Sequence, residues 1–369
     1  VQIPNAGTYG IELACVLGML LSKPGNTMEI CAGIKPEHVE KAKKLVAEGF
    51  VHVKVLKSSQ FYIECTATDG KDTVHTITED EHDNLVFCEK NGEVLLDKRV
   101  KKEAVESEEK EGTFDVTKHT FSEFYNWANE VDVADLQFIK EAIDINMEIA
   151  KKGMEKKYAF GVGPTVQNLL EKGMLKADVV TAVRSIPAAA ADFRMSGGNG
   201  SVMTFCGSGN QGIATTLPVV VYAEEIKADE EHLVRALVLS HLTAIYIKQS
   251  LGRLSALCGC VVAATGSSCG ITYLMGGGYE AVSFAVKNMI ANLTGMMCDG
   301  AKPSCSLKLM TGVSTAVLSA MLAMENHSVS SVEGIIDDDV DKSIRNLTLI
   351  GRDGMNETDH LILKIMTSK

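Results

Sequence analysis

The chain has 369 residues, which is long enough for about two domains with a sizeable hydrophobic core. Apolar residues make up 46% and charged residues 23%, a globular composition that excludes a disordered chain. The net charge of −12 argues against nucleic acid or an anionic membrane surface as the main partner, although a local pocket for a small anion stays open.

Residues 1–112 predict an α+β lobe. A helix is expected at about 8–22 and an amphipathic helix at Pro36–Glu48. The charge-dense segment Lys101–Gly112 is predicted to be a solvated linker that ends this lobe. Short β-rich runs between Gly, Asp and Asn turns predict the strands of a mixed, largely antiparallel sheet at Thr27–Ala32, Val51–Leu56, Tyr62–Thr68, Asp72–Thr78 and Asn84–Glu89.

Residues 113–369 predict a larger, all-helical domain. Apolar faces with the period of a helix recur along this part of the chain. The expected helices are Ser122–Val131, Val133–Lys156, Val166–Lys172, Lys176–Ala190, 213–227, 230–250, 256–275, 279–296, 306–325 and a pair after 335.

The 26 residues of the run 254–279 carry no formal charge, which raises the alternative of a membrane span. Six glycines interrupt the run, and neither an aromatic belt nor a basic flank frames it. We therefore expect no membrane association, and we place this helix at the centre of the helical domain.

Ten cysteines are too few for a disulfide-built secreted domain, and residues 1–22 lack a basic region ahead of their apolar run. A cytoplasmic protein with reduced thiols is therefore expected. The chain opens on Val-Gln-Ile-Pro rather than Met, so we expect a processed chain or a fragment whose first lobe is truncated at its N-terminus.

Five of the ten cysteines lie between residues 258 and 305. Six residues separate Cys298 from Cys305, a poor spacing for zinc, but the glycine and proline between them predict a loop that can turn both thiolates inward. Three thiolates can hold three irons of a four-iron cubane and leave the last iron open as a Lewis acid. Unrelated buried thiols are the alternative. The preceding helix offers further thiols at Cys258, Cys260 and Cys269.

A glycine-rich stretch, Gly207-Ser-Gly-Asn-Gln-Gly212, formally matches G-x-G-x-x-G and precedes a predicted helix. A dinucleotide site also needs parallel strands with an acidic residue at a strand end, and none is predicted here, so we expect no NAD. The backbone N–H groups of such a helix start suit the carboxylate of a small substrate. A tight turn between packed helices is the alternative. The candidate substrate-binding residues are Ser208, Gly209 and Asn210.

Three further polar residues are candidates for the chemistry. Arg253 could clamp a substrate carboxylate, although a surface salt bridge explains it equally well. His241 and Lys248 share roughly one helix face and are candidates for catalytic proton transfer, with a satisfied core histidine as the simpler interpretation of His241. Met275-Gly-Gly-Gly278 comes without a lysine motif, so we expect a helix break there and no pyridoxal phosphate (PLP).

Three of these motifs together resemble a known family. Arg253-Leu-Ser-Ala-Leu-Cys258, Gly207-Ser-Gly-Asn-Gln-Gly212 and Met297-Cys-Asp-Gly-Ala-Lys-Pro-Ser-Cys305 are similar to the L-cysteine desulfidase family, also known as UPF0597. That family is related to the alpha part of the iron–sulfur L-serine dehydratases. The resemblance extends over essentially the whole chain.

The resemblance implies a [4Fe–4S] cluster held by Cys258, Cys298 and Cys305, with Cys260 and Cys269 left to packing. It also implies β-elimination from L-cysteine to sulfide, ammonia and pyruvate, in which a base removes the α-proton and the open iron takes the leaving thiolate. Family members carry an additional N-terminal Gly-Cys-Thr-Glu-Pro motif, and this chain starts after that point. A catalytic element is therefore expected to lie outside the chain.

Two alternatives to L-cysteine desulfidation stay open. L-serine dehydration is the same chemistry with hydroxide as the leaving group. A non-catalytic metal-binding or redox-sensing protein would use the same thiols without turnover. The expected ligand is a small L-amino acid, and a homodimer is one option for the assembly.

Overall fold

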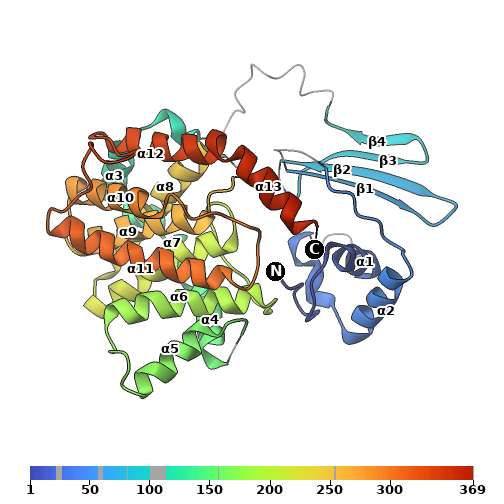
Figure 1. The fold of residues 1–369 in the computed structure, drawn as a ribbon, viewed down its shortest axis with the longest axis horizontal. Coiled ribbons are helices and arrows are strands. Elements are labelled where there is room, and N and C mark those ends of the chain that lie inside the picture. The colour runs from blue at the N-terminus through green and yellow to red at the C-terminus, as the bar shows by residue number, and fades with distance from the viewer. Residues whose placement is uncertain are drawn as a thin grey trace.

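The computed structural model describes residues 1–21, 27–56, 61–80, 82–99, 114–156, 158–252 and 255–368. Figure 1 shows a smaller lobe, with a sheet and two helices, beside a larger body of helices. The predicted α+β fold class is confirmed. The predicted linker Lys101–Gly112, and with it the boundary between the domains, lies outside the described residues.

In the smaller lobe, helices α1 (Ile11–Leu21) and α2 (Pro36–Ala47) pack on each other around buried apolar side chains that include Val16 and Leu17. In the sheet, Asn91 and Gly92 take positive φ angles of 53° and 87°, as a two-residue hairpin turn requires. The described strands form an antiparallel meander in the order β1 (Tyr62–Thr68), β2 (Thr73–Glu79), β3 (Leu85–Lys90) and β4 (Glu93–Asp97).

Two predicted strands are wrong. Thr27–Gly33 forms a 3₁₀ helix, because a short apolar run does not by itself distinguish a helix from a strand. Val51–Leu56 has no regular structure; Val53 and Val55 are 41% and 49% exposed, so its alternating pattern is not used to bury one face of a sheet. Strand β4 was not predicted, and its Val94 and Leu95 are exposed at the sheet edge.

In the larger body, the predicted helical pattern is confirmed with shifted ends. The predicted helix Val133–Lys156 begins as a 3₁₀ turn, Val133–Leu136, which Asp132 caps by accepting from the Ala134 N–H. The helices are α3 (Phe121–Glu130), α4 (Ile139–Glu155), α5 (Val162–Glu171), α6 (Val179–Met195), α7 (Gly209–Ile226), α8 (Glu230–Leu251), α9 (Gly259–Leu274), α10 (Tyr279–Leu293), α11 (Cys305–Met324), α12 (Val340–Leu349) and α13 (Asn356–Met366).

Helix α9 lies at the centre of this body, as predicted. It packs against α7, α8, α10 and α11, and its side chains from Cys260 to Thr272 are buried. Glycine permits the close approach to α8, because a Cβ at Gly266 would lie 2.3 Å from the Ser240 carbonyl oxygen. The uncharged run is therefore a buried core helix of 16 residues, and Met275-Gly-Gly-Gly278 ends it.

One described helix, α11, is long and apolar enough by length and composition to cross a membrane. Half of its apolar window is buried inside the protein, where α11 packs against α6, α9 and α10. Core helices have this same composition, so one such helix is weak evidence for a membrane span.

Candidate functional site

A short backbone bridge joins two segments that are far apart in sequence. Leu257 pairs antiparallel with Met297. The Cys258 N–H donates to the Met296 carbonyl at 2.9 Å, and the Cys298 N–H donates to the Ala256 carbonyl at 2.6 Å. The bridge therefore brings Cys258, which caps the N-terminus of α9, next to Cys298.

The loop 298–305 folds back so that Cys305 lies within electrostatic reach of Cys298. Gly300 has a φ of +88°, which L side chains rarely adopt, and the Cys305 Sγ lies 3.7 Å from the Gly300 carbonyl oxygen. Asp299 forms ion pairs with Lys302 and Lys308 that tie the loop to α11, and these two cations lower the pKa of Asp299 to about 2. Cys305 is the first residue of α11.

A further thiol belongs to this group. Cys260 donates a hydrogen bond to Cys258, and it is close enough to feel the charges of Cys298 and Cys305. We call Cys258, Cys260, Cys298 and Cys305 the thiol cluster. Cys269 lies nine residues beyond Cys260, about 14 Å along the helix, and contacts Thr243 and Ser268 instead.

Three thiols of the thiol cluster differ in pKa. The hydrogen bond from Cys260 lowers the pKa of Cys258 to about 6, against the opposing effect of burial, and the nearby Lys308 ammonium lowers it further. The same hydrogen bond and burial raise the pKa of Cys260, and burial raises the pKa of Cys298. Of Cys258, Cys260 and Cys298, Cys258 is thus the one whose thiol most readily becomes a thiolate, the form that binds soft metals.

Among the described residues, no three His, Cys, Asp or Glu side chains are arranged to hold a single metal ion. A cubane makes a different demand, because each of its cysteines binds a different iron and the sulfurs therefore stand farther apart than around one ion. The donor set of the thiol cluster, soft sulfur with a lysine ammonium beside it, fits an iron–sulfur group.

The glycine-rich stretch forms the start of α7. Gly207 has a φ of +65°, and the Ser208 N–H donates to the Gln211 Oε1 at 2.7 Å. The Arg194 side chain of α6 lies against Gly209, where a Cβ would be 2.5 Å from its Nε, and its Nη1 donates to the Asn210 Oδ1 at 3.2 Å. This helix start is therefore built around a guanidinium.

The helix start of α7 lies next to the thiol cluster. A Cβ at Gly259, between Cys258 and Cys260, would lie 2.8 Å from the Gln211 Nε2. Arg194 is close enough to Cys260 and Cys305 for their charges to act on it. The structure thus brings the predicted substrate-binding segment and the predicted ligands together.

His241 and Lys248 have different surroundings. His241 is 4% exposed, with its Nε2 3.3 Å from the Thr216 hydroxyl and its ring against Phe205. Burial lowers the pKa of His241 to about 3, so its imidazole is neutral and weakly basic. Lys248 donates to the Gly252 carbonyl at 2.9 Å and lies near Cys206, which immediately precedes the glycine-rich stretch. Their catalytic roles stay predictions, and Arg253 lies outside the described residues.

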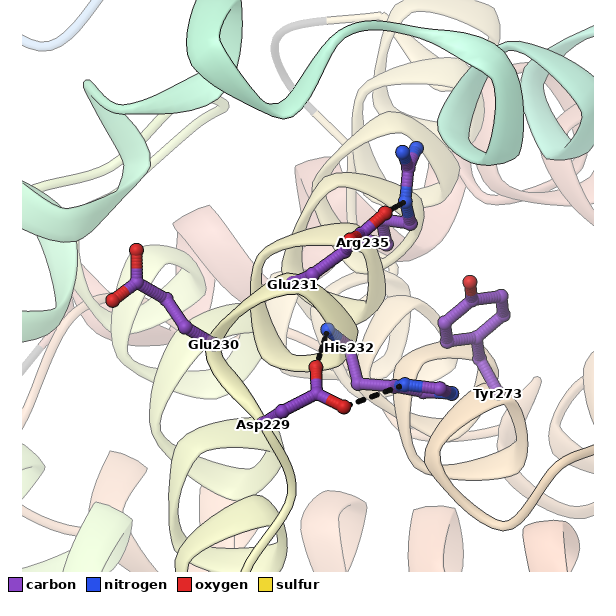
Figure 2. A pocket seen from close by; sticks show the side chains of 6 residues that line it. All are labelled: Asp229, Glu230, Glu231, His232, Arg235 and Tyr273. Carbon is purple, nitrogen blue, oxygen red and sulfur yellow. Dashed lines mark hydrogen bonds and ion pairs between the residues drawn. The ribbon is translucent and has the colours of Figure 1, made fainter.

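A cavity of about 500 Å³ lies elsewhere, at the N-terminus of α8 (Figure 2). Asp229 caps this helix by accepting from the His232 N–H, and the His232 ring faces Tyr273. Tyr273 is 13 residues from Cys260 on α9, which is roughly 20 Å along the helix. This cavity is therefore separate from the thiol cluster.

Sequence reasoning missed three residues of this region. Arg194 follows a run of alanines on α6, and no motif singled it out. Gln211 stands inside the glycine-rich motif, and its position in the capping turn could have indicated a role. Cys260 was assigned to packing, but the structure places it beside Cys258.

Fold and site together define an α+β protein in which the N-termini of α7, α9 and α11 gather thiols, a guanidinium and a glycine-rich turn. The profile of the serine dehydratase alpha chain family matches residues 26–364. The chain therefore belongs to this family, which is lyase-like.

The relatives carry the same family name that the motifs suggested. The chain is 50% identical to a UPF0597 protein of Bacteroides fragilis and 48% identical to one of Porphyromonas gingivalis. A UPF0597 protein of Oleidesulfovibrio alaskensis is 40% identical. Each comparison covers 100% of this chain and 85%, 86% and 85% of the relative, respectively.

Proposed function

We propose that the protein is a [4Fe–4S]-dependent lyase that removes the β-substituent of a small L-amino acid, with L-cysteine as the substrate. In this reaction the Cα–H and Cβ–S bonds break and a Cα=Cβ bond forms. The resulting 2-aminoacrylate takes up water and releases ammonia, so L-cysteine and water give pyruvate, ammonia and hydrogen sulfide. The cytoplasm, where thiols stay reduced, is the expected compartment.

The observation that carries this proposal is the convergence of Cys258, Cys298 and Cys305 from two distant segments beside the start of α7. We assign these three thiolates as ligands. A four-iron cluster held by these three thiolates would have one iron without a protein ligand, and that iron would supply Lewis acidity toward the leaving sulfur or oxygen.

The chain's own residues would hold and orient the substrate. The substrate-binding candidates Ser208, Gly209 and Asn210 lie at a helix N-terminus, where a carboxylate is favoured. Gly209 and Asn210 offer backbone N–H groups, and Ser208 offers its hydroxyl, because its own N–H donates to the Gln211 Oε1. Lys308 places a positive charge near Cys258 and Cys298, which favours their thiolate forms. Both predicted proton-transfer residues lie near the segment just before the glycine-rich stretch, Lys248 near Cys206 and His241 against Phe205.

Anaerobic reconstitution followed by iron and sulfide analysis tests the ligand assignment. Changing Cys258, Cys298 or Cys305 to Ser is expected to lower bound iron and to abolish sulfide release from L-cysteine. Cys269→Ser is the matched control, because Cys269 is a buried thiol on α9 that lies outside the thiol cluster. Full iron content in the three variants, or equal loss in the control, would refute the assignment.

L-serine dehydration is the second candidate function, favoured by the match to the serine dehydratase alpha chain family. The two substrates differ in the leaving group, sulfur against oxygen. Comparing kcat/KM for sulfide release from L-cysteine with that for pyruvate release from L-serine decides between them. A reconstituted protein that carries the family's N-terminal Gly-Cys-Thr-Glu-Pro segment and retains its cluster but turns over neither amino acid would instead be a metal-binding or redox-sensing protein.

A further inference from the structure

A partly buried cation lies at the start of α7 without a carboxylate partner. Arg194 uses its Nη1 to donate to the Asn210 side chain, and its pKa is lowered by burial. Among the described residues no carboxylate pairs with it, and the charges that act on it are those of the Cys260 and Cys305 thiols. Withdrawing a guanidinium from water is costly unless an anion compensates for it.

A buried hydrogen-bond donor points into the same region. Gln211 is 4% exposed, and its Oε1 is used by the Ser208 N–H. Its Nε2 has no hydrogen-bond partner among the described residues, and it lies against Gly259 at the edge of the thiol cluster. Buried amide donors without an acceptor are rare in folded proteins, so this one indicates a ligand that accepts.

The helix itself adds donors. The N–H groups of Gly209 and Asn210 have no acceptor within α7, and the helix dipole favours negative charge at this end. The guanidinium, the unpaired amide and the helix N-terminus thus all lie at the start of α7, and all three suit an anion.

We propose that Arg194, the Gln211 Nε2 and the N-terminus of α7 form a subsite that binds the α-carboxylate of a small amino acid and directs its side chain toward the thiol cluster. The identity of the ligand as an amino acid rests on the proposed function; the preference for a carboxylate rests on these donors alone. The predicted role of Arg253 as a carboxylate clamp stays a prediction beside this subsite, because Arg253 lies outside the described residues.

A different role for Arg194 would be to balance the charge of the thiolates. In that case its removal would change the iron content of the reconstituted protein but not the affinity for a carboxylate. Binding of an inert probe separates the two roles. L-Alanine has the carboxylate and no leaving group, and L-alanine methyl ester lacks the carboxylate charge.

Calorimetric titration of the full chain with both probes tests the subsite. Wild type is expected to bind L-alanine roughly 10–100-fold more tightly than the ester, the range expected when one charge-assisted interaction is lost. Arg194→Gln should weaken L-alanine binding by a similar factor and leave the ester unchanged. Gln211→Glu keeps an acceptor for Ser208 but replaces the donor with a negative oxygen, so it should weaken L-alanine at least as much.

Arg184→Gln is the matched control, because Arg184 lies on the same helix about 15 Å from Arg194. It should leave both affinities unchanged. If wild type binds no L-alanine, binds the ester equally well, or keeps its L-alanine affinity in Arg194→Gln, the subsite is refuted. If Arg194→Gln fails to fold, Arg194→Lys replaces it as the test variant. Lysine keeps the positive charge but loses the two parallel donors of the guanidinium, so L-alanine should bind with reduced affinity. Unchanged affinity in Arg194→Lys would refute the subsite.

The outcome is separable from that of the proposed function. A protein that binds L-alanine through Arg194 but releases neither sulfide nor pyruvate would support the subsite and refute the lyase. An active lyase whose KM does not change in Arg194→Gln would support the lyase and refute the subsite.

Discussion

At the scale of single residues, His241 lies where a charge would be costly. It is buried between α7 and α8, and its folded pKa of about 3 is below the unfolded value of about 6.5. The unfolded state therefore binds more protons between these values, so the stability is fully present above about pH 6.5 and is lost as the pH falls toward 3. At pH 5 the loss is about 2 kcal/mol.

His241→Gln can keep the hydrogen bond to Thr216, and it should remove the part of the acid-induced loss of stability that His241 causes. The free energy of unfolding measured with urea at pH 7 and pH 5 checks it: the variant should lose about 2 kcal/mol less than wild type between the two values. His360→Gln on the exposed side of α13 is the control and should follow wild type. If His241→Gln loses as much stability as wild type between pH 7 and pH 5, the His241 imidazole is not held in its neutral form by burial.

Single residues also show how far the site could be predicted. The motifs around Cys258, Cys298 and Cys305 suggested a common centre, and the structure brings these residues together. Arg194 and Gln211 could not be predicted to meet there, because their proximity depends on how α6, α7 and α9 pack, which no local pattern encodes. The place of Cys260 in the thiol cluster could not be predicted either, because it depends on the backbone bridge that positions Cys258.

At the scale of elements, the contact between α8 and α9 depends on the absence of a side chain. Gly266→Ala would place a Cβ 2.3 Å from the Ser240 carbonyl oxygen and force the two helices apart. We expect it to lower the free energy of unfolding by about 1–3 kcal/mol, the range for overpacked cores.

Gly18→Ala in α1 is the control, because nothing lies within 4 Å of the added methyl group. It should be neutral or stabilise by up to about 1 kcal/mol through helix propensity. Urea unfolding of both variants measures the difference. A Gly266→Ala protein as stable as wild type would mean that α8 and α9 are not packed at this distance.

The helices of the larger body were predicted well because each has apolar residues that recur with the helical period over several turns, a pattern that is visible in the sequence itself. The misassigned elements, Thr27–Gly33 and Val51–Leu56, are short, and their apolar residues fit more than one local structure. Helix α7 begins earlier than predicted because Gly209 and Asn210 were assigned to a loop, whereas Ser208 caps the helix.

At the scale of the whole molecule, distant parts of the chain meet around the site. The Gln2 N–H donates to the Met195 carbonyl, and the Asn5 N–H donates to the Gly197 carbonyl, at the end of α6. Met366 of α13 fills the space next to Gly300 in the cysteine loop, and Figure 1 shows α13 reaching from the helical body toward the smaller lobe. The first and last described segments therefore support the site.

Gly197→Ala tests the N-terminal contact. Gly197 has a φ of +68°, and an added Cβ would lie 2.9 Å from the Ile3 carbonyl oxygen. The variant should lose about 1–2 kcal/mol from backbone strain, and residues 1–8 should exchange their amide hydrogens faster. Gly173→Ala has the same φ but free space, so it should share the strain and leave this exchange unchanged. Equal exchange in the two variants would contradict the contact.

The central claim is that three thiolates of this chain hold a four-iron cluster with one iron open to the substrate. Mössbauer spectroscopy of the full chain, reconstituted anaerobically with isotopically enriched iron and sulfide, tests it most directly. We predict a cluster in which one iron differs from the other three and changes its signal when L-cysteine is added. Four equivalent irons, or a spectrum indifferent to L-cysteine, would contradict the claim.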